Sequence, residues 1–242
     1  MKKGYGIFGK PYEIMLRNDL HDEKSIDHEL MRNMVLLDKD SFKYLYNKPV
    51  CPNMSNHELY AFAQRFKAAS EKLSIQNILD FTSGMAERYD VDFSEMLFGG
   101  TEKQILERET DWCADMARVG CVLLQCIGIP CRILHLANLD KAYNGHVAGE
   151  AYYENHYGIV DFIYGYQFYD IKPIDAHEVT QNPELLNPYP ESYRGLFSAI
   201  GISEYDPTNG NNSYIVSTPN KYYMNLIYAN HNDTWIMGED NE

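Results

Sequence analysis

The sequence lacks the features that mark several classes of protein. Only five of its 242 residues are cysteines, an odd number that argues against a disulfide framework. It has no apolar run of roughly 18 residues, the length that a membrane-spanning helix needs. The residues after Lys2 and Lys3 form a stretch too short and too polar for a signal-peptide core. We therefore expect a reduced, cytoplasmic protein without a membrane partner.

Positive charge is also scarce. There are 21 Lys and Arg residues against 35 Asp and Glu, and the formal net charge is −14. No Lys/Arg cluster stands out, and neutralising phosphates supplies much of the affinity of proteins for nucleic acids. We therefore expect no nucleic-acid partner. With 45% hydrophobic residues the chain can bury a substantial core, and we expect a single domain over residues 1–242.

The clearest helix pattern lies between Glu109 and Pro130. Apolar or small residues recur there at the spacing of a buried helical face. They are Cys113, Met116, Ala117, Gly120, Cys121, Leu124 and Ile127. Thr110 or Asp111 is expected to cap the start, and Gly128 with Pro130 to end the helix. Cys113 is thereby placed in the opening turn.

That position makes Cys113 the candidate nucleophile. The unpaired amides and the dipole at a helix N-terminus carry roughly half a positive charge, which favours a thiolate over a thiol. The same amides can stabilise an oxyanion that develops in the transition state of acyl transfer.

A β-hairpin is predicted next, with arms over residues 146–153 and 156–163. Both arms are rich in aromatic and β-branched residues, and Glu154-Asn155 is the expected turn. If Tyr153 pairs with His156, then His146 and Asp161 are diagonal neighbours on one face of the hairpin. A three-residue loop would place them on opposite faces.

These residues together predict a Cys113–His146–Asp161 triad. The imidazole of His146 takes or shares the thiol proton of Cys113. The Asp161 carboxylate then fixes the tautomer of the ring and stabilises the imidazolium.

Two blocks of sequence resemble the transglutaminase-like superfamily, the papain-like enzymes that include transglutaminases, peptide N-glycanases and bacterial cysteine hydrolases. The first block is Asp-Trp-Cys113-Ala-Asp-Met-Ala, which continues to Gly-Ile-Pro-Cys-Arg132. The second is Gly-His146-Val-Ala-Gly-Glu-Ala-Tyr-Tyr, followed by Tyr-Gly-Ile-Val-Asp161. The resemblance implies an α+β papain-like, transglutaminase-core fold in which the catalytic helix packs on an antiparallel sheet. Residues 55–175 would form this core, between extensions at 1–54 and 176–242.

Three positions depart from the family pattern. Ala148 stands where many members carry an aromatic residue, Tyr157 replaces the usual Trp, and Phe162 replaces the usual Pro. These changes affect the walls of the acyl site more than the triad, so they weaken any transfer of substrate from the family.

The resemblance implies acyl chemistry on an amide bond of a peptide, a protein or another substrate, with no cofactor. Hydrolysis by a protease, amidase or deamidase is favoured over transamidation, which needs a second cleft that admits an amine and excludes water. The competing interpretation is an inactive domain of the same fold that binds peptides or glycans through some of its 20 tyrosines. The intact triad favours the enzyme.

A zinc site was the main alternative for the cysteines. On a helix, Cys121 and Cys126 point in directions different from Cys113, and Cys131 lies beyond Pro130, so no tetrahedral cluster is expected. We predict no metal site there, and interpret Cys121, Cys126 and Cys131 as small buried hydrophobes.

Roles can also be assigned to four further polar residues. Glu150 shares a strand face with His146 and is expected to be structural. His135 and His156 are expected to be structural or surface histidines. Gln104 is a weak candidate for an oxyanion donor through its side-chain amide.

The remaining elements are expected as follows. A helix should run from the capping box at Ser55-Asn-His-Glu58 to Lys72. A second helix, capped by Ser74, should have an apolar face made of Ile75, Ile78, Leu79, Thr82, Met85 and Tyr89. We also expect strands at Tyr5–Leu16, Tyr164–Ile174, Ser213–Val216 and Tyr222–Tyr228, a helix at Ser25–Leu37 and a loop at Gln181–Glu191.

Overall fold

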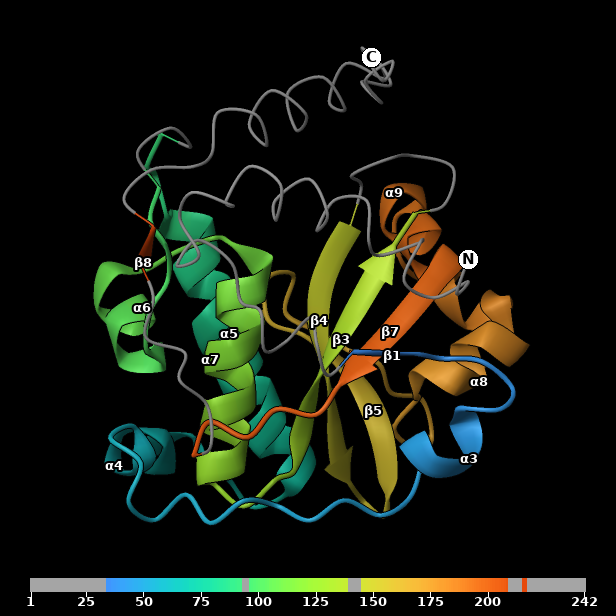
Figure 1. The fold of residues 1–242 in the computed structure, drawn as a ribbon, viewed down its shortest axis with the longest axis horizontal. Helices are drawn as coiled ribbons and strands as arrows, with labels where there is room; N and C mark the ends of the chain where they lie inside the picture. The colour runs from blue at the N-terminus through green and yellow to red at the C-terminus, as the bar shows by residue number, and fades with distance from the viewer. Residues whose placement is uncertain (1–33, 93–95, 139–144, 209–214, 217–242) are drawn as a thin grey trace, which may run out of the picture.

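The computed structural model describes residues 34–92, 96–138, 145–208 and 215–216. Its centre is a six-stranded antiparallel sheet in the order β1-β7-β3-β4-β5-β6 (Figure 1). The strands are β1 (Val35–Leu36), β3 (Cys131–Ala137), β4 (Gly145–Tyr153), β5 (His156–Asp161), β6 (Tyr166–Gln167) and β7 (Ala199–Ser203). A separate pair joins β2 (Phe98–Gly99) to β8 (Ile215–Val216).

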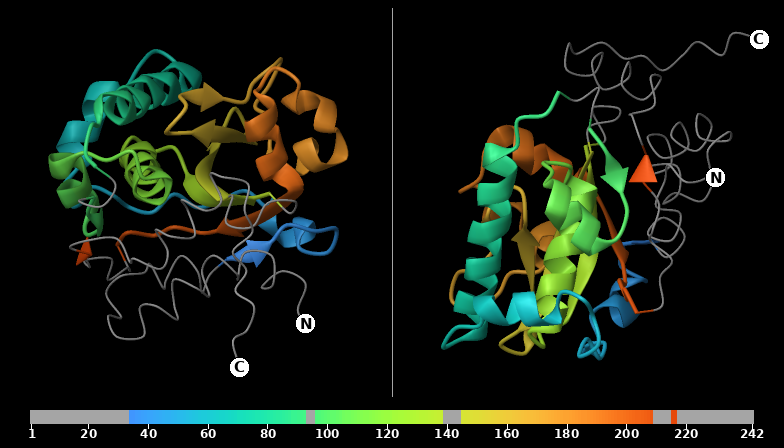
Figure 2. Two further views of the ribbon diagram at one scale, coloured as in Figure 1. Left: turned by 90° about the horizontal axis from the view of Figure 1, so that it is seen from above. Right: turned by 90° about the vertical axis from the view of Figure 1, so that its left-hand side faces the viewer.

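Helices cover both faces of this sheet, as Figure 2 shows from above. One face carries α4 (Tyr60–Ala63), the 3-10 turn Gln64–Phe66, α5 (Glu71–Arg88), α6 (Glu102–Arg108) and α7 (Cys113–Cys126). The other carries α3 (Phe42–Leu45), α8 (Ala176–Gln181), α9 (Glu191–Arg194) and the 3-10 turns Pro183–Leu186 and Gly195–Ser198. The α+β class expected from the sequence is confirmed.

The alternation of side chains along the strands divides the core in two. Val147 and Ala151 of β4 pack with α7, whereas Ala148 packs with the helices of the other face. This is the two-residue period of a strand buried on both sides. His146 of β4 and Asp161 of β5 lie on the same face of the sheet, the face that α9 covers.

The direction of α7 places its start at one end of the sheet. Gln125, near the end of α7, donates from Nε2 to the carbonyl oxygen of Cys131 at 3.0 Å, which ties that end to the beginning of β3. β3 then runs back along the helix to Ala137, which pairs with Gly145 at the start of β4. The first residues of α7 and β4 therefore lie at the same end of the molecule.

The helix predicted around Cys113 is confirmed as α7, and Gly128 follows it with the expected positive φ of 91°. Helix α7 is buried on more sides than its apolar pattern indicates. Asp115, Arg118 and Gln125 fall outside that pattern, yet all three are buried. Asp115 accepts hydrogen bonds from Arg108 at 2.6 Å and from the amide of Gly99 at 2.9 Å. Polar side chains thus hold the helix on the sides that the apolar pattern leaves out.

The prediction for the helices before α7 was partly wrong. The expected helix over residues 55–72 shrinks to α4 and one 3-10 turn, because the chain turns to extended backbone at Lys67. Ser70, not Ser74, caps α5, and its Oγ accepts from the amide of Leu73 at 3.2 Å. Ser74 lies within the helix and donates to the carbonyl of Ser70. The buried face predicted for α5 is confirmed from Ile75 to Met85, but Tyr89 is the C-cap of the helix and is only partly buried.

Several weaker predictions also need correction. β1 occupies the end of the helix expected at Ser25–Leu37, and only Tyr166–Gln167 of the strand expected up to Ile174 forms one. The expected loop at Gln181–Glu191 contains a 3-10 turn, Pro183–Leu186. β7 was not predicted. Tyr5–Leu16 and Tyr222–Tyr228 lie outside the described residues. Among the described helices, none is long and apolar enough to cross a membrane.

Two helical glycines offer a matched test of the packing between α7 and the sheet. A Cβ on Gly120 of α7 would lie 2.1 Å from Cδ1 of Phe162, whose ring is fully buried, whereas a Cβ on Gly84 of α5 would meet nothing within 4 Å. Gly120→Ala should lower the free energy of unfolding by about 2–3 kcal/mol through overpacking. Gly84→Ala should raise it by roughly 0.5–1 kcal/mol through helix propensity. Urea denaturation measures both, and equal effects would contradict the packing described here.

Candidate active site

The β4–β5 hairpin brings His146 and Asp161 together. Tyr153 pairs with His156 as predicted, and the turn residues Glu154 and Asn155 have φ values of 51° and 62°. Two consecutive residues at positive φ are typical of a two-residue type I′ hairpin turn. The predicted register is confirmed, and His146 Nε2 lies 2.7 Å from Asp161 Oδ2.

Asp161 is a buried carboxylate whose two oxygens both accept hydrogen bonds. It is fully buried, and its Oδ1 accepts from the amides of Ile163 and Tyr164, both at 3.0 Å. Its Oδ2 accepts from the hydroxyl of Tyr193 at 2.6 Å and from His146. Burial alone would raise the pKa of this carboxyl, but His146 and the hydrogen bonds outweigh it and lower the pKa. Asp161 is therefore ionised at neutral pH.

The Asp161 carboxylate raises the pKa of the His146 imidazole. Burial lowers the pKa of this imidazole, but the charge and hydrogen bond of Asp161, together with a hydrogen bond to Cys113, raise the pKa to about 10. Because Nε2 is bonded to Asp161, Nδ1 is the nitrogen left to exchange a proton with a thiol. At neutral pH the ring is an imidazolium held by a buried carboxylate.

Cys113 is the first residue of α7 and is half-buried. The first intrahelical bond runs from the amide of Met116 to the carbonyl of Trp112 at 2.9 Å. The amides of residues 113–115 therefore have no acceptor within the helix and can receive an anion. The N-cap is Trp112, not Thr110 or Asp111 as predicted. Thr110 acts one step earlier by accepting from the amide of Trp112 at 3.0 Å.

Two tyrosines of the site were missed in the sequence. Tyr193 of α9 bonds Asp161 although 32 residues separate them. Tyr164 follows β5, is 51% exposed, and its ring centroid lies 5.4 Å from that of His146. Burial, followed by the charges of Asp161 and Cys113, raises the pKa of Tyr164. Among 20 tyrosines, no local pattern distinguishes these two.

Glu150, His135 and Gln104 have other partners. Glu150 is fully buried and pairs with Arg132 at 2.7 Å, which agrees with the structural role expected for it. His135 is buried beside Ser203 at 3.0 Å, and burial lowers its pKa to about 4. Gln104 closes the capping box of α6 by accepting from the amide of Thr101. This contact uses Oε1 of Gln104 and does not test the oxyanion role considered for its amide nitrogen.

Cys121, Cys126 and Cys131 are buried, as expected of small hydrophobes. Burial raises the pKa of Cys121 and Cys126, the latter to about 12, so neither is a ready nucleophile. The sulfur atoms of Cys121 and Cys131 lie 3.2 Å apart. In the part of the chain that the structure describes, no group of cysteines is arranged to hold a metal ion. The one group with suitable ligands there is His156, Asp175 and Glu178.

Comparisons with known proteins add little to this geometry. No family model matches the sequence, and no curated protein matches it. A crystal structure from Cytophaga hutchinsonii, provisionally described as a cysteine protease, is similar with a TM-score of 0.35 and 16% sequence identity. The similarity covers 60% of this chain and 47% of that one, so the chain spans about half the length of its neighbour.

The charge on His146 can be tested by titration. Its folded pKa of about 10 lies above the ordinary value of 6.5, so the His146–Asp161 pair stabilises the fold fully below that ordinary value. This stabilisation should be lost as the pH rises through about 10. NMR of the imidazole Cε1–H should show the transition near that pH, and Asp161→Asn should move it toward lower pH. A His146 transition near 6.5 would contradict the assigned charge state.

The contribution of Tyr193 can be measured through its hydroxyl. Tyr193→Phe removes one of the hydrogen bonds to the buried Asp161 carboxylate and should lower the free energy of unfolding by about 1–2 kcal/mol. Tyr189→Phe is the matched control, because Tyr189 stacks on Phe168 at 4.2 Å in the same aromatic cluster. Equal losses in the two variants would show that the bond to Asp161 contributes nothing.

Proposed function

We propose that the protein is a cysteine enzyme of the transglutaminase-like, papain-like type, and that it acts on amide bonds through a thioester on Cys113. The observation that carries the proposal is the buried His146–Asp161 pair, 2.7 Å apart, with an imidazole whose pKa is raised by Asp161 and by a hydrogen bond to Cys113. In this proposal Cys113 is the nucleophile, His146 the acid and base, and Asp161 the group that orients the ring.

The proposed reaction starts from a thiolate–imidazolium pair. The Cys113 sulfur attacks the amide carbonyl carbon, and the oxyanion is stabilised by amides at the start of α7. His146 gives its proton to the leaving amine, which departs and leaves a thioester. The neutral ring then takes a proton from water, and the resulting hydroxide attacks the thioester. Release of the acid restores the thiolate and the imidazolium.

Water is the proposed acceptor, so the favoured activity is that of a protease, amidase or deamidase. Transamidation requires a cleft that admits an amine and keeps water out. Hydrolysis needs no second cleft of this kind. The substrate is accordingly proposed as a peptide, a protein or another amide.

A binding module is the second candidate. The observation that favours it is the exposed ring of Tyr164, which stacks on Tyr166 at 5.6 Å and lies beside His146. Exposed tyrosines supply contact area to peptides and sugars at low entropic cost. Ligand binding that survives His146→Ala undiminished, without turnover in the wild type, would favour this candidate.

Selective alkylation tests the nucleophile. At pH 6 iodoacetamide should modify Cys113 at least ten times faster than Cys51, because Cys113 lies at a helix start beside the His146 ring, the setting of a reactive cysteine. Burial raises the pKa of Cys51, which makes it a suitable internal reference. His146→Ala should remove most of the difference. Site-resolved mass spectrometry measures both rates, and equal rates in the wild type would refute the assignment.

Activity profiling tests the reaction itself. The wild type and Cys113→Ala should be compared on libraries of peptides, glutamine amides and glycopeptides, with and without an added primary amine. Free acid products that vanish with Cys113→Ala would support hydrolysis, and amine-linked products would support transamidation. Turnover that persists in Cys113→Ala would exclude the proposed mechanism.

A further inference from the structure

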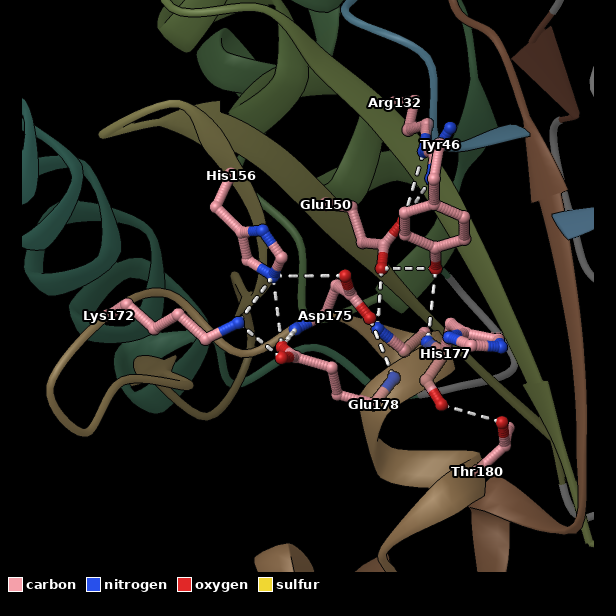
Figure 3. A network of polar contacts seen from close by, with 10 residues as sticks. Tyr46, Arg132, Glu150, His156, Lys172, Asp175, His177, Glu178 and Thr180 are labelled. Carbon is pink, nitrogen blue, oxygen red and sulfur yellow. Dashed lines mark hydrogen bonds and ion pairs between the residues drawn. The ribbon is translucent and has the colours of Figure 1, made fainter. Parts of the chain in front are cut away.

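A group of metal-ligating side chains lies at the other end of β5 from the candidate active site. His156 is the first residue of β5, whereas Asp161 is the last. Asp175 is the N-cap of α8, and Glu178 is the third residue of that helix. Figure 3 shows the imidazole of His156 and the carboxylates of Asp175 and Glu178 pointing toward one another from the strand and the helix.

The spacing of the three ligand atoms fits one metal ion. His156 Nε2 lies 3.1 Å from Asp175 Oδ2 and 3.0 Å from Glu178 Oε2, and all three atoms lie within 4.8 Å of one another. Ligands at about 2.0–2.2 Å from a tetrahedral or octahedral ion are themselves roughly 3–3.5 Å apart. Little movement is therefore needed to seat an ion between them.

The charges around the group leave one buried carboxylate without a permanent cation. Glu150 pairs with Arg132 at 2.7 Å, and Glu178 pairs with Lys172. The side chain of Asp175 is 5% exposed, and its Oδ1 accepts only a backbone amide bond, from Glu178 at 2.7 Å. Its Oδ2 faces His156.

We propose that His156 Nε2, Asp175 Oδ2 and Glu178 Oε2 bind a divalent transition-metal ion of the zinc type. One nitrogen and two carboxylate oxygens, completed by water, form a ligand set that suits zinc. The imidazole disfavours magnesium and calcium, which prefer oxygen ligands. The ion would join the start of α8 to the start of β5 and supply the positive charge that Asp175 lacks. Its role is structural, and it does not depend on the function proposed for Cys113.

Lys172 is the internal competitor for this site. Its ammonium bonds Glu178 Oε1 and lies 3.3 Å from His156 Nε2. The side chain is 49% exposed, so it can swing away from the imidazole at small cost. Because Lys172 uses Oε1 and the metal would use Oε2, Glu178 can serve both cations. The competing account is that the hydrogen bonds among His156, Asp175, Glu178 and Lys172 alone hold the group together, with no metal involved.

Zinc titration of the full chain decides between these accounts. All proteins carry Cys113→Ser, so that the candidate nucleophile does not bind the ion. The parent should bind about one equivalent of Zn²⁺ in calorimetry, and a hundredfold excess over its Kd should raise its Tm by about 5 °C. Cobalt should bind with visible d–d bands and no thiolate charge-transfer absorption, which separates this site from the remaining cysteines.

Three variants complete the test. His156→Gln keeps a hydrogen-bond donor near both carboxylates but lacks the imidazole ligand, and should weaken zinc binding at least a hundredfold. His177→Gln is the matched control on the same helix: His177 stacks on Phe42 at 3.6 Å, and its loss should leave zinc binding unchanged. Lys172→Ala should tighten binding severalfold. Equal zinc affinity in the parent and His156→Gln, or no Tm shift with zinc in the parent, would overturn the proposal and favour a group held together by hydrogen bonds alone.

Discussion

The interaction on which the candidate site depends is the burial of the Asp161 carboxylate. A buried carboxylate is costly unless its oxygens are bonded, and here four donors satisfy them: two backbone amides, one tyrosine hydroxyl and one imidazole. These donors come from β4, from the turn after β5 and from α9. One charge therefore organises three segments of the chain, and the position and charge of the His146 ring follow from it.

The position of Cys113 has a separate cause. α7 is held by buried polar contacts, such as Asp115 with Arg108 and Gln125 with the start of β3, in addition to its apolar packing. The turn that leads into it contains Glu109 at a φ of 59°, a conformation that costs a residue other than glycine of order 1–3 kcal/mol. The side chain of Glu109 bonds Arg88 of α5, at 3.0 Å to its Nε. The helix start is thus placed by these polar contacts in addition to the packing of α7 on the hairpin that carries the histidine.

The parts of the site that could be predicted are those controlled by local rules. The period of α7 and the two-residue turn of the hairpin are short-range properties, and they suffice to place Cys113 at a helix start and to put His146 and Asp161 on one face. Tyr193 could not be predicted, because its contact with Asp161 depends on how a four-residue helix packs on the sheet. The helix cap was assigned to Ser74 instead of Ser70 for a similar reason. Both serines precede apolar positions, and only the extended backbone at Ser70 distinguishes the cap.

The central claim is that Cys113, His146 and Asp161 act as one acyl-transfer unit. The most direct measurement is the first turnover with an activated ester, p-nitrophenyl acetate, followed by absorbance and by intact and peptide-level mass spectrometry. If the three residues act together, the wild type should release a burst of about one equivalent of nitrophenolate and carry a transient acetyl group on Cys113 that decays more slowly in Asp161→Asn. Absence of a burst, or an acetyl group on another residue in its place, would show that Cys113 is not the nucleophile of such a unit.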